Sequence, residues 1–267
     1  LIQGNSLGRF TEEAPISYQS GKEIATHFVL EGSTLRFAVD AYDSTQALTI
    51  DPARLWATFY GGTSNDNGYS CATDPSGNVY LAGFTYSNSA IASGGHDNSY
   101  GGNTDAFLVK FNTSGTRLWA TYYGGTGYEY AFSCATDPSG NVYLAGRTTS
   151  TSSIASGGHD NSHGGNADAF LVKFNSSGTR QWATYYGGTS NDYSYSCATD
   201  PSGKVYLAGH TNSSSSIASG GHDNSHGGNT DAFLVKFNTN GTRQWATYYG
   251  GTNYDYSQSC ATDPSGN

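Results

Sequence analysis

One spacing dominates the sequence: the same segment recurs every 63 residues. Three residue types mark this period in register, at Trp56, Trp119, Trp182 and Trp245, at Cys71, Cys134, Cys197 and Cys260, and at Asp74, Asp137, Asp200 and Asp263. By direct count, residues 105–167 and 168–230 are identical at 51 of 63 positions. A chain with such a period folds by stacking one small unit on the next, so the repeat constrains every element within it.

Each unit contains the pattern of four β-strands. In the first complete unit the expected strands are 69–74, 78–83, 105–111 and 117–123. The third alternates, with Phe107, Val109 and Phe111 on one face and Leu108 and Lys110 on the other. Aromatic and β-branched residues favour strands throughout, and no ten-residue window carries an apolar stripe at helical spacing.

These units predict an all-β fold, a β-propeller built of four-stranded antiparallel blades with a 63-residue repeat. One such sheet cannot bury both of its faces alone, whereas stacked blades can. Residues 54–267 hold three complete blades, flanked by an extra fourth strand at 54–60 and an extra first strand near Cys260. A closed ring needs at least four blades. We therefore expect an incomplete ring, an open arc that the remaining blades of a longer parent protein close; an open array of hairpins is the alternative.

The connections divide between two faces of each blade, because an antiparallel chain reverses at every turn. The tight turns 74–77 and 112–116 lie together, and the longer connections 61–68 and 86–104 lie on the opposite face. Long connections are usually functional or mobile. We expect any ligand to meet this second face.

That face carries a recurring Gly-Gly-His-Asp-Asn-Ser motif at 94–99, 157–162 and 220–225. Together with the neighbouring connection it supplies the candidate ligand- or cation-binding residues Asp66, His96, Asp97, Glu129, His159, Asp160, His163, Asp192, His222, Asp223, His226 and Asp255. Carboxylates and carbonyls held by glycine turns suit calcium, and paired imidazoles suit a softer metal. The third interpretation, which we favour, is that Asp and Asn cap their own turns. No cofactor is then required, and calcium is the alternative.

The repeated cysteines and tryptophans are interpreted as structural. Equivalent positions in successive blades are related by rotation, which holds their Cα atoms beyond the roughly 7 Å that a disulfide tolerates. We expect buried free thiols, and we expect mid-strand Trp119 in the core. Loop tyrosines remain candidates for sugar contact, at Tyr100, Tyr128, Tyr193 and Tyr254.

Three segments resemble a known family. Trp-Ala-Thr-Tyr-Tyr-Gly-Gly at 119–125, Asp-Pro-Ser-Gly-Asn-Val-Tyr at 137–143 and Asp-Ala-Phe-Leu-Val-Lys-Phe at 168–174 are similar to the SBBP-type β-propeller repeat of bacterial secreted and surface proteins. Residues 1–53, through 13–19 and 50–52, resemble the C-terminal part of the uncharacterised β-rich domain that often precedes such repeats. The resemblance implies a propeller and an extracellular or cell-surface location, but no defined reaction. The long segment between the second and third strands departs from the family's pattern.

The net charge of the chain argues against some classes of binding partner. The net charge of −9 argues against nucleic acid and acidic membranes, and no apolar run reaches the roughly 18 to 20 residues of a membrane span. No phosphate-binding loop, nucleophile elbow or zinc-protease helix motif occurs.

Near-identical repeats favour binding over catalysis. We expect a non-enzymatic extracellular or cell-surface scaffold or adhesion module, whose partner is a surface protein or a glycan. One alternative is a glycan-binding, lectin-like module stabilised by calcium. The other is a polysaccharide-degrading enzyme, which would need one blade to differ by a well-placed carboxylate pair. The differences between repeats, at 127–132 and 147–151, exchange mostly small or polar residues.

Overall fold

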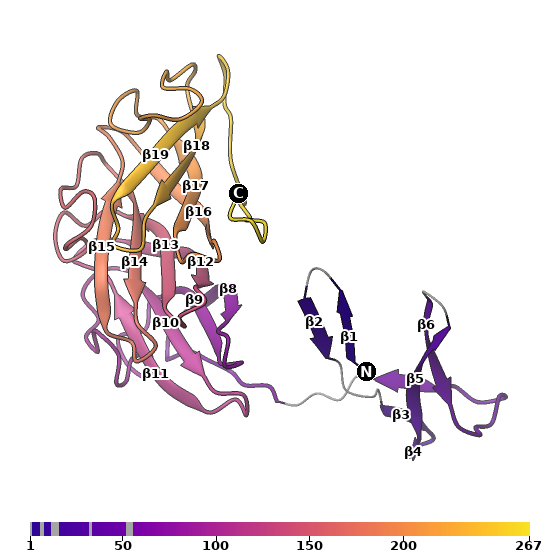
Figure 1. Cartoon of the computed structure of the whole chain (residues 1–267). Helices are drawn as coiled ribbons and strands as arrows, with labels where there is room; N and C mark the ends of the chain where they lie inside the picture. The colour runs from indigo at the N-terminus through magenta and orange to yellow at the C-terminus, as the bar shows by residue number, and fades with distance from the viewer. Residues whose placement is uncertain (1, 6–7, 12–15, 32–33, 52–55) are drawn as a thin grey trace. The chain divides into compact units, whose positions relative to one another are not determined.

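The chain divides into two compact units, Leu1–Ala57 and Thr58–Asn267. The computed structural model describes residues 2–5, 8–11, 16–31, 34–51 and 56–267, and these residues contain no helix. The first unit has three small antiparallel sheets (Figure 1). Their strands, in spatial order, are β1 (Ile2–Asn5) and β2 (Gly8–Thr11); β4 (Lys22–Ile24), β3 (Ile16–Gln19) and β7 (Thr49–Asp51); and β5 (Thr26–Glu31) and β6 (Thr34–Val39).

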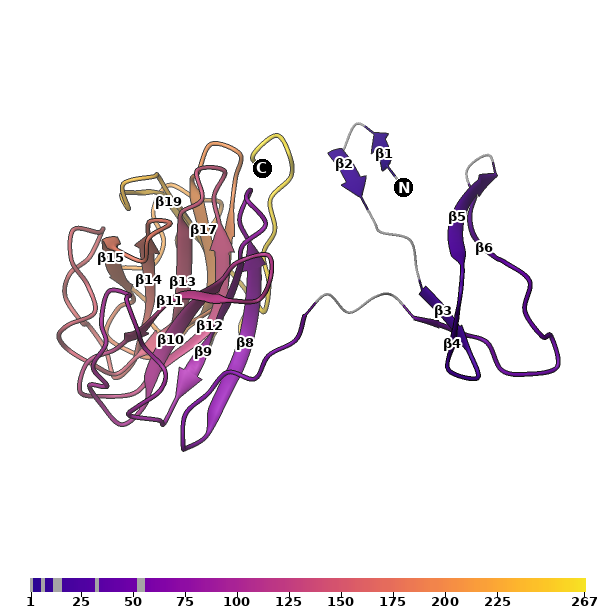
Figure 2. The same ribbon diagram turned by 90° about the horizontal axis from the view of Figure 1, so that it is seen from below.

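The second unit consists of three four-stranded antiparallel sheets, one for each repeat, stacked in chain order (Figures 1 and 2). The first blade is β8 (Asp66–Thr73), β9 (Val79–Thr85), β10 (Asp105–Phe111) and β11 (Arg117–Tyr123). The second is β12 (Glu129–Thr136), β13 (Val142–Thr148), β14 (Asp168–Phe174) and β15 (Arg180–Tyr186), and the third is β16 (Asp192–Thr199), β17 (Val205–Thr211), β18 (Asp231–Phe237) and β19 (Arg243–Tyr249). The sheets do not close on one another, so the expected all-β, open propeller is confirmed.

The expected third and fourth strands have the observed bounds, but the first and second strands run longer than expected. β8 begins at Asp66 rather than at residue 69, because a bulge between Gly68 and Ser70 lets pairing with β9 continue past Tyr69. The same bulge recurs in β12 and β16. A bulge adds one residue to one strand and twists it, which turns the bulged side chain away from the regular ladder.

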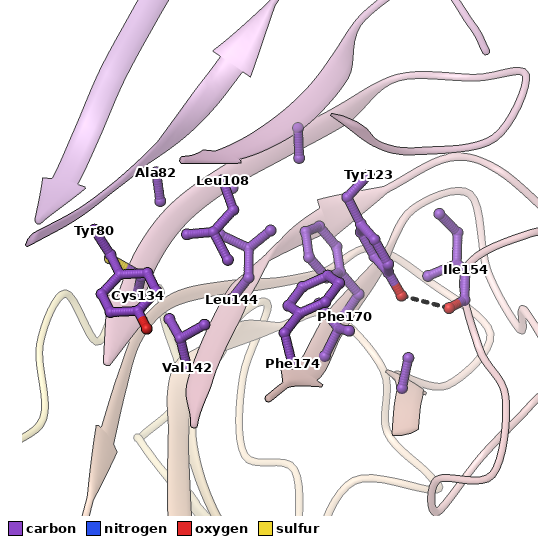
Figure 3. Packing of buried hydrophobic residues seen from close by; sticks show 14 of the residues in the cluster. Tyr80, Ala82, Leu108, Tyr123, Cys134, Val142, Leu144, Ile154, Phe170 and Phe174 are labelled. Atoms are coloured by element: carbon purple, nitrogen blue, oxygen red, sulfur yellow. Dashed lines mark hydrogen bonds between the residues drawn. The ribbon is translucent and has the colours of Figure 1, made fainter. Parts of the chain in front are cut away.

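The core lies between blades. Leu108 of the first blade is fully buried in one cluster with Phe170 and Phe174 of the second (Figure 3). Leu171 of the second blade is buried in the next cluster with Val235 of the third. The third strand of the middle blade, β14, therefore buries both of its faces, as the stacking argument requires, and Trp119 and Trp182 are 5% exposed.

The first strand of each blade lies nearest to the first strand of the next, and polar side chains join them. The Cys134 N–H donates to Oγ of Ser70 over 3.0 Å, and the Thr136 hydroxyl donates to the Thr73 carbonyl over 2.6 Å. The same two bonds recur between the second and third blades. We call these first strands the inner strands.

Neither expected flanking strand forms. Residues 56–60 are not in a strand, and Arg54 and Leu55 lie outside the described residues. The segment around Cys260 is also not a strand, although the Cys260 N–H still donates to Oγ of Ser196. The physical reason is the same at both places: the described residues contain no neighbouring strand of the same sheet with which these segments could form a ladder.

The long connection between the second and third strands covers the outer edge of its own blade. Ser93 and Ala120 exchange two backbone hydrogen bonds of 2.9 Å, and the Tyr122 N–H donates to the Asp97 carbonyl. The same pairing recurs at Ser156 and Ser219. These bonds satisfy an edge that would otherwise be free to pair with another chain.

Candidate functional site

The loop aspartates cap their own turns. Oδ1 of Asp97 accepts the N–H of Ser99 over 2.8 Å, and Asp160 and Asp223 accept the equivalent N–H groups over 2.9 Å. This is the arrangement of the self-capping interpretation, in which each carboxylate serves its own backbone.

The loop histidines contact different partners. The rings of His96 and His159 lie 6.1 and 6.2 Å from Phe174 and Phe237 of the next blade. His163 and His226 instead pack edge-on against the last-strand tyrosines Tyr185 and Tyr248, and His222 is exposed. Burial, with the nearby Arg180, lowers the pKa of His96. Within the described part of the chain, no three His, Cys, Asp or Glu side chains are placed to hold a metal ion together.

The carboxylates of the neighbouring connection are turned inward. Glu129 accepts the N–H of Gly125 over 2.8 Å and the hydroxyl of Thr148 over 2.6 Å. The other three members of this set also accept a backbone N–H, at Asp66, Asp192 and Asp255. Glu129 and Asp192 are fully buried.

A second buried carboxylate accompanies Glu129 and was not expected from the sequence. A Cβ on Gly124 would lie 2.6 Å from Oδ1 of Asp105 and 2.7 Å from Oε2 of Glu129, so the two groups flank one glycine. Burial, with the Glu129 charge contributing, raises the pKa of Asp105 to about 6. Gly187 and Gly250 are flanked in the same way, by Asp168 with Asp192 and by Asp231 with Asp255. The available signal in the sequence was an Asp at the start of a strand whose other residues, apart from one Lys, are apolar.

The tight-turn face, to which we assigned no function, holds a hollow of about 580 Å³. Four successive copies of Thr-Asp-Pro line it, at 73–75, 136–138, 199–201 and 262–264. The Asp74 carboxylate points away from it, accepting the N–H groups of Ser76 and Asn78 and lying 3.1 Å from Nζ of Lys110. The hollow therefore presents threonine and exposed proline, together with the exposed Asp263 of the last copy.

A continuous aromatic strip crosses the three blades near the start of the inner strands. It consists of Phe84, Tyr130, Arg147, Tyr193, His210 and Tyr256. Consecutive groups lie 4.6 to 5.2 Å apart, measured between ring centroids or from the guanidinium carbon to a ring. Of the four loop tyrosines named as sugar-contact candidates, Tyr193 belongs to the strip. Tyr128 and Tyr254 lie parallel to its members Tyr130 and Tyr256. Tyr100 does not belong to the strip, because it bonds the Asn103 carbonyl and packs against Tyr122.

Stacked four-stranded antiparallel blades with one sequence repeat per sheet define the second unit as a β-propeller repeat module. Family models agree: the SBBP β-propeller repeat matches residues 118–152 and 181–215, and a DUF5122 β-propeller domain of unknown function matches 91–117 and 216–243. A further domain of unknown function, DUF7948, matches residues 1–53. The expected resemblance is confirmed at these segments: the chain contains SBBP-type β-propeller repeats, and they follow a segment that matches DUF7948.

Individual relatives are distant. The chain is 28% identical to an uncharacterized WD repeat-containing protein, L264, of Acanthamoeba polyphaga mimivirus, over 56% of this chain and 13% of that protein. It is 30% identical to the regulatory protein FlaEY of Caulobacter vibrioides, over 54% of this chain and 15% of that protein. The chain thus spans only 13 to 15% of the length of these curated relatives.

Among solved structures, that of rhamnogalacturonan lyase YesW aligns with 88% of this chain and 47% of its own, at 13% identity and a TM-score of 0.27. A similarity this low supports no argument about fold or reaction. Within the described residues, no helix has the length and apolar character needed to cross a bilayer.

Proposed function

We propose that this chain is a non-enzymatic propeller module that acts outside the cell or on its surface, as a scaffold for adhesion. One observation supports it most: the carboxylates of the tight turns make the same internal bonds in every blade. The turn aspartates Asp74, Asp137 and Asp200 each accept two N–H groups of their own turn. Side chains used in this way serve the fold.

The packing is repeated with the same fidelity. The Tyr123 hydroxyl donates to the Ile154 carbonyl over 2.5 Å (Figure 3), and Tyr186 donates to Ile217 over 2.6 Å. Catalysis needs one specialised site, whereas a scaffold gains from equal units that each contact only their neighbours. A chain built in this way is suited to spacing and presenting surfaces.

Retention of polymers tests this proposal. The immobilised full chain is exposed to dextran, xylan, polygalacturonate and gelatin, and binding is followed by surface plasmon resonance. Polymer length is measured by light scattering after prolonged incubation. We expect saturable retention of at least one polymer, with its length unchanged and with no retention by heat-denatured chain.

Two results would contradict the proposal. Retention of none of the four polymers would remove the adhesion role, and shortening of any of them would show an enzyme. The location has its own test: protease added to intact producing cells should remove the protein, and full protection would contradict a surface role.

A further inference from the structure

One position in the second strand differs in every repeat, although the fold of the blade is the same. The second strand of each blade reads Val-Tyr-Leu-Ala-Gly-x-Thr, and x is Phe84, Arg147 and His210 in turn. Directly across the ladder, x pairs with Asn67, Tyr130 and Tyr193 of the inner strand. Flanking residues are identical, so x changes while the blade stays the same, and Arg147 is the most exposed of the three. The sequence differences between the repeats, mostly small or polar exchanges, therefore also include aromatic and charged groups.

Contacts across the blade junctions join these positions into one strip. Within the second blade, Arg147 lies over the Tyr130 ring at 4.7 Å, and across the junction it lies over the Tyr193 ring at the same distance. Phe84 meets Tyr130 across the first junction, at 4.6 Å between centroids. The stacked rings hold the guanidinium in one plane, which is a preorganised arrangement.

The Arg147 side chain has no hydrogen-bond acceptor among the described residues, in contrast to Lys110 and Arg243. Lys110 is paired with Asp74, and the side chain of Arg243 donates to the Ile217 carbonyl. The contacts of Arg147 are with aromatic faces, and its side chain is half-buried. A planar guanidinium whose N–H groups remain free is suited to bind a carboxylate by two parallel hydrogen bonds.

Exposed tyrosines lie beside the strip. Tyr69 stacks on Phe84, and Tyr128 lies parallel to Tyr130. Their exposed fractions are 55% and 44%, and Tyr256 at the other end of the strip is 55% exposed. Tyrosine offers an apolar face and a polar tip, so it suits a ligand that is flat and hydroxylated.

We propose that the aromatic strip binds an acidic polysaccharide, with a uronate carboxylate on Arg147 and neighbouring sugar rings on the tyrosine faces. This inference rests on the proposed function and names its ligand class. Arg147 is flanked by aromatic rings on both sides, and exposed tyrosines lie beside it, which favours a ligand whose carboxylate is attached directly to a ring that can stack there. A uronate has this geometry, because its carboxylate is attached to the sugar ring. An acidic peptide carries its carboxylates on flexible stems.

The test uses the full chain with polygalacturonate, fully methyl-esterified polygalacturonate and poly-glutamate, by isothermal titration at low ionic strength. The main variant is Arg147→Phe, because Phe84 already occupies this position in the first blade and packs on Tyr130. The matched control is Lys204→Asn, which also removes one cation and installs the residue of the other repeats at 78, 141 and 267. Thermal melts confirm that both variants fold.

We expect Arg147→Phe to weaken polygalacturonate binding at least tenfold and Lys204→Asn to leave it within twofold. The methyl ester should bind the native chain as weakly as polygalacturonate binds the variant, because both lack the carboxylate–guanidinium pair. Equal binding by Arg147→Phe and the native chain would overturn the proposal. So would Arg147-dependent binding of poly-glutamate at equal affinity, which would indicate an acidic-peptide surface. If the chain retains other polymers but not polygalacturonate, this inference alone is overturned. If the chain retains none of the polymers, the proposed function is overturned as well.

Discussion

The indole N–H of Trp119 donates to the backbone carbonyl of Ser176, 57 residues further along the chain, over 3.1 Å. Nζ of Lys110 donates to the same carbonyl over 3.2 Å. Ser176 lies in the tight turn of the second blade, so this turn accepts two bonds from the first blade while the apolar faces of the sheets pack. Trp182 and Lys173 bond the Thr239 carbonyl of the third blade in the same way.

The glycine two residues after Ser176 should be sensitive to substitution. Gly178 has φ +82°, and a Cβ there would lie 2.8 Å from the Trp119 ring. Gly178→Ala should lower the free energy of unfolding by about 2–4 kcal/mol, from backbone strain and overpacking together. Gly140→Ala is the matched control, since Gly140 has φ +78° with nothing within 4 Å of its Cβ. It should lose only the backbone part, about 1 kcal/mol, in urea unfolding; equal losses would contradict the ring contact.

The buried ion pair of Lys110 and Asp74 gives a second prediction. Their side chains are 6% and 4% exposed, with 3.1 Å between Nζ and Oδ2. Lys110→Met should lower the free energy of unfolding by about 3 kcal/mol, because Asp74 stays buried without its cation. Adding Asp74→Asn should recover part of that loss, because the amide oxygen still accepts from the turn. A double mutant less stable than Lys110→Met would contradict this account.

The carboxylate pairs make stability depend on pH. Burial raises the folded-state pKa of Asp105 and Asp192 from 3.8 to about 6. Between pH 4 and pH 6 these two carboxyl groups stay protonated in the folded chain but ionise in the unfolded chain. The stabilisation of the folded state by this protonation is therefore full below pH 4 and is lost as the pH rises through 6. Burial also opposes ionisation of Asp74, but bonds from Asn78 and Lys110 outweigh it and lower its pKa, so that contribution is lost in acid. The free energy of unfolding should be higher at pH 5 than at pH 7.5.

Removing one carboxylate of a pair should make the free energy of unfolding depend less on pH. Asp105→Asn should raise the free energy of unfolding at pH 7.5 by on the order of 1 kcal/mol, since it relieves a buried charge beside Glu129. The control is Asp97→Asn, at a carboxylate that only caps its own turn. Chemical denaturation at both pH values measures each variant, and an unchanged slope in Asp105→Asn would show that the pair does not act as described.

The thiols should differ sharply in reactivity. All four cysteines are free; Cys134 and Cys197 are buried, Cys260 is partly buried and Cys71 is exposed. Burial raises the pKa of Cys134 to about 12, which removes the reactive thiolate at neutral pH. Maleimide labelling followed by mass spectrometry should modify Cys71 first and should reach Cys134 and Cys197 only after unfolding. Equal native labelling at all four would contradict the stacked inner strands.

Much of the fold could be predicted because its signals are local. The turn after Asp74 and the alternation in 105–111 are each encoded within a few neighbouring residues, and the period of 63 identifies the three complete blades of this chain. The self-capping of Asp97 was equally accessible, since its carboxylate bonds the N–H two residues ahead. The predicted start of the first strand was wrong because a bulge extends β8, and the pairing with β9 decides where this bulged strand begins.

By itself, the sequence determined the repeat, the four strands of each blade and the internal role of its turns. Only the tertiary structure decided that the long connection covers an edge, that Asp105 lies beside Glu129 and that Arg147 lies between Tyr130 and Tyr193. The physical reason is that these contacts join different strands, and some of them different blades. Hydrophobic stacking brings the blades together and sets which of their side chains are in contact. The sequence pattern specifies the residues along one strand, but it does not specify which residues of other strands lie beside them.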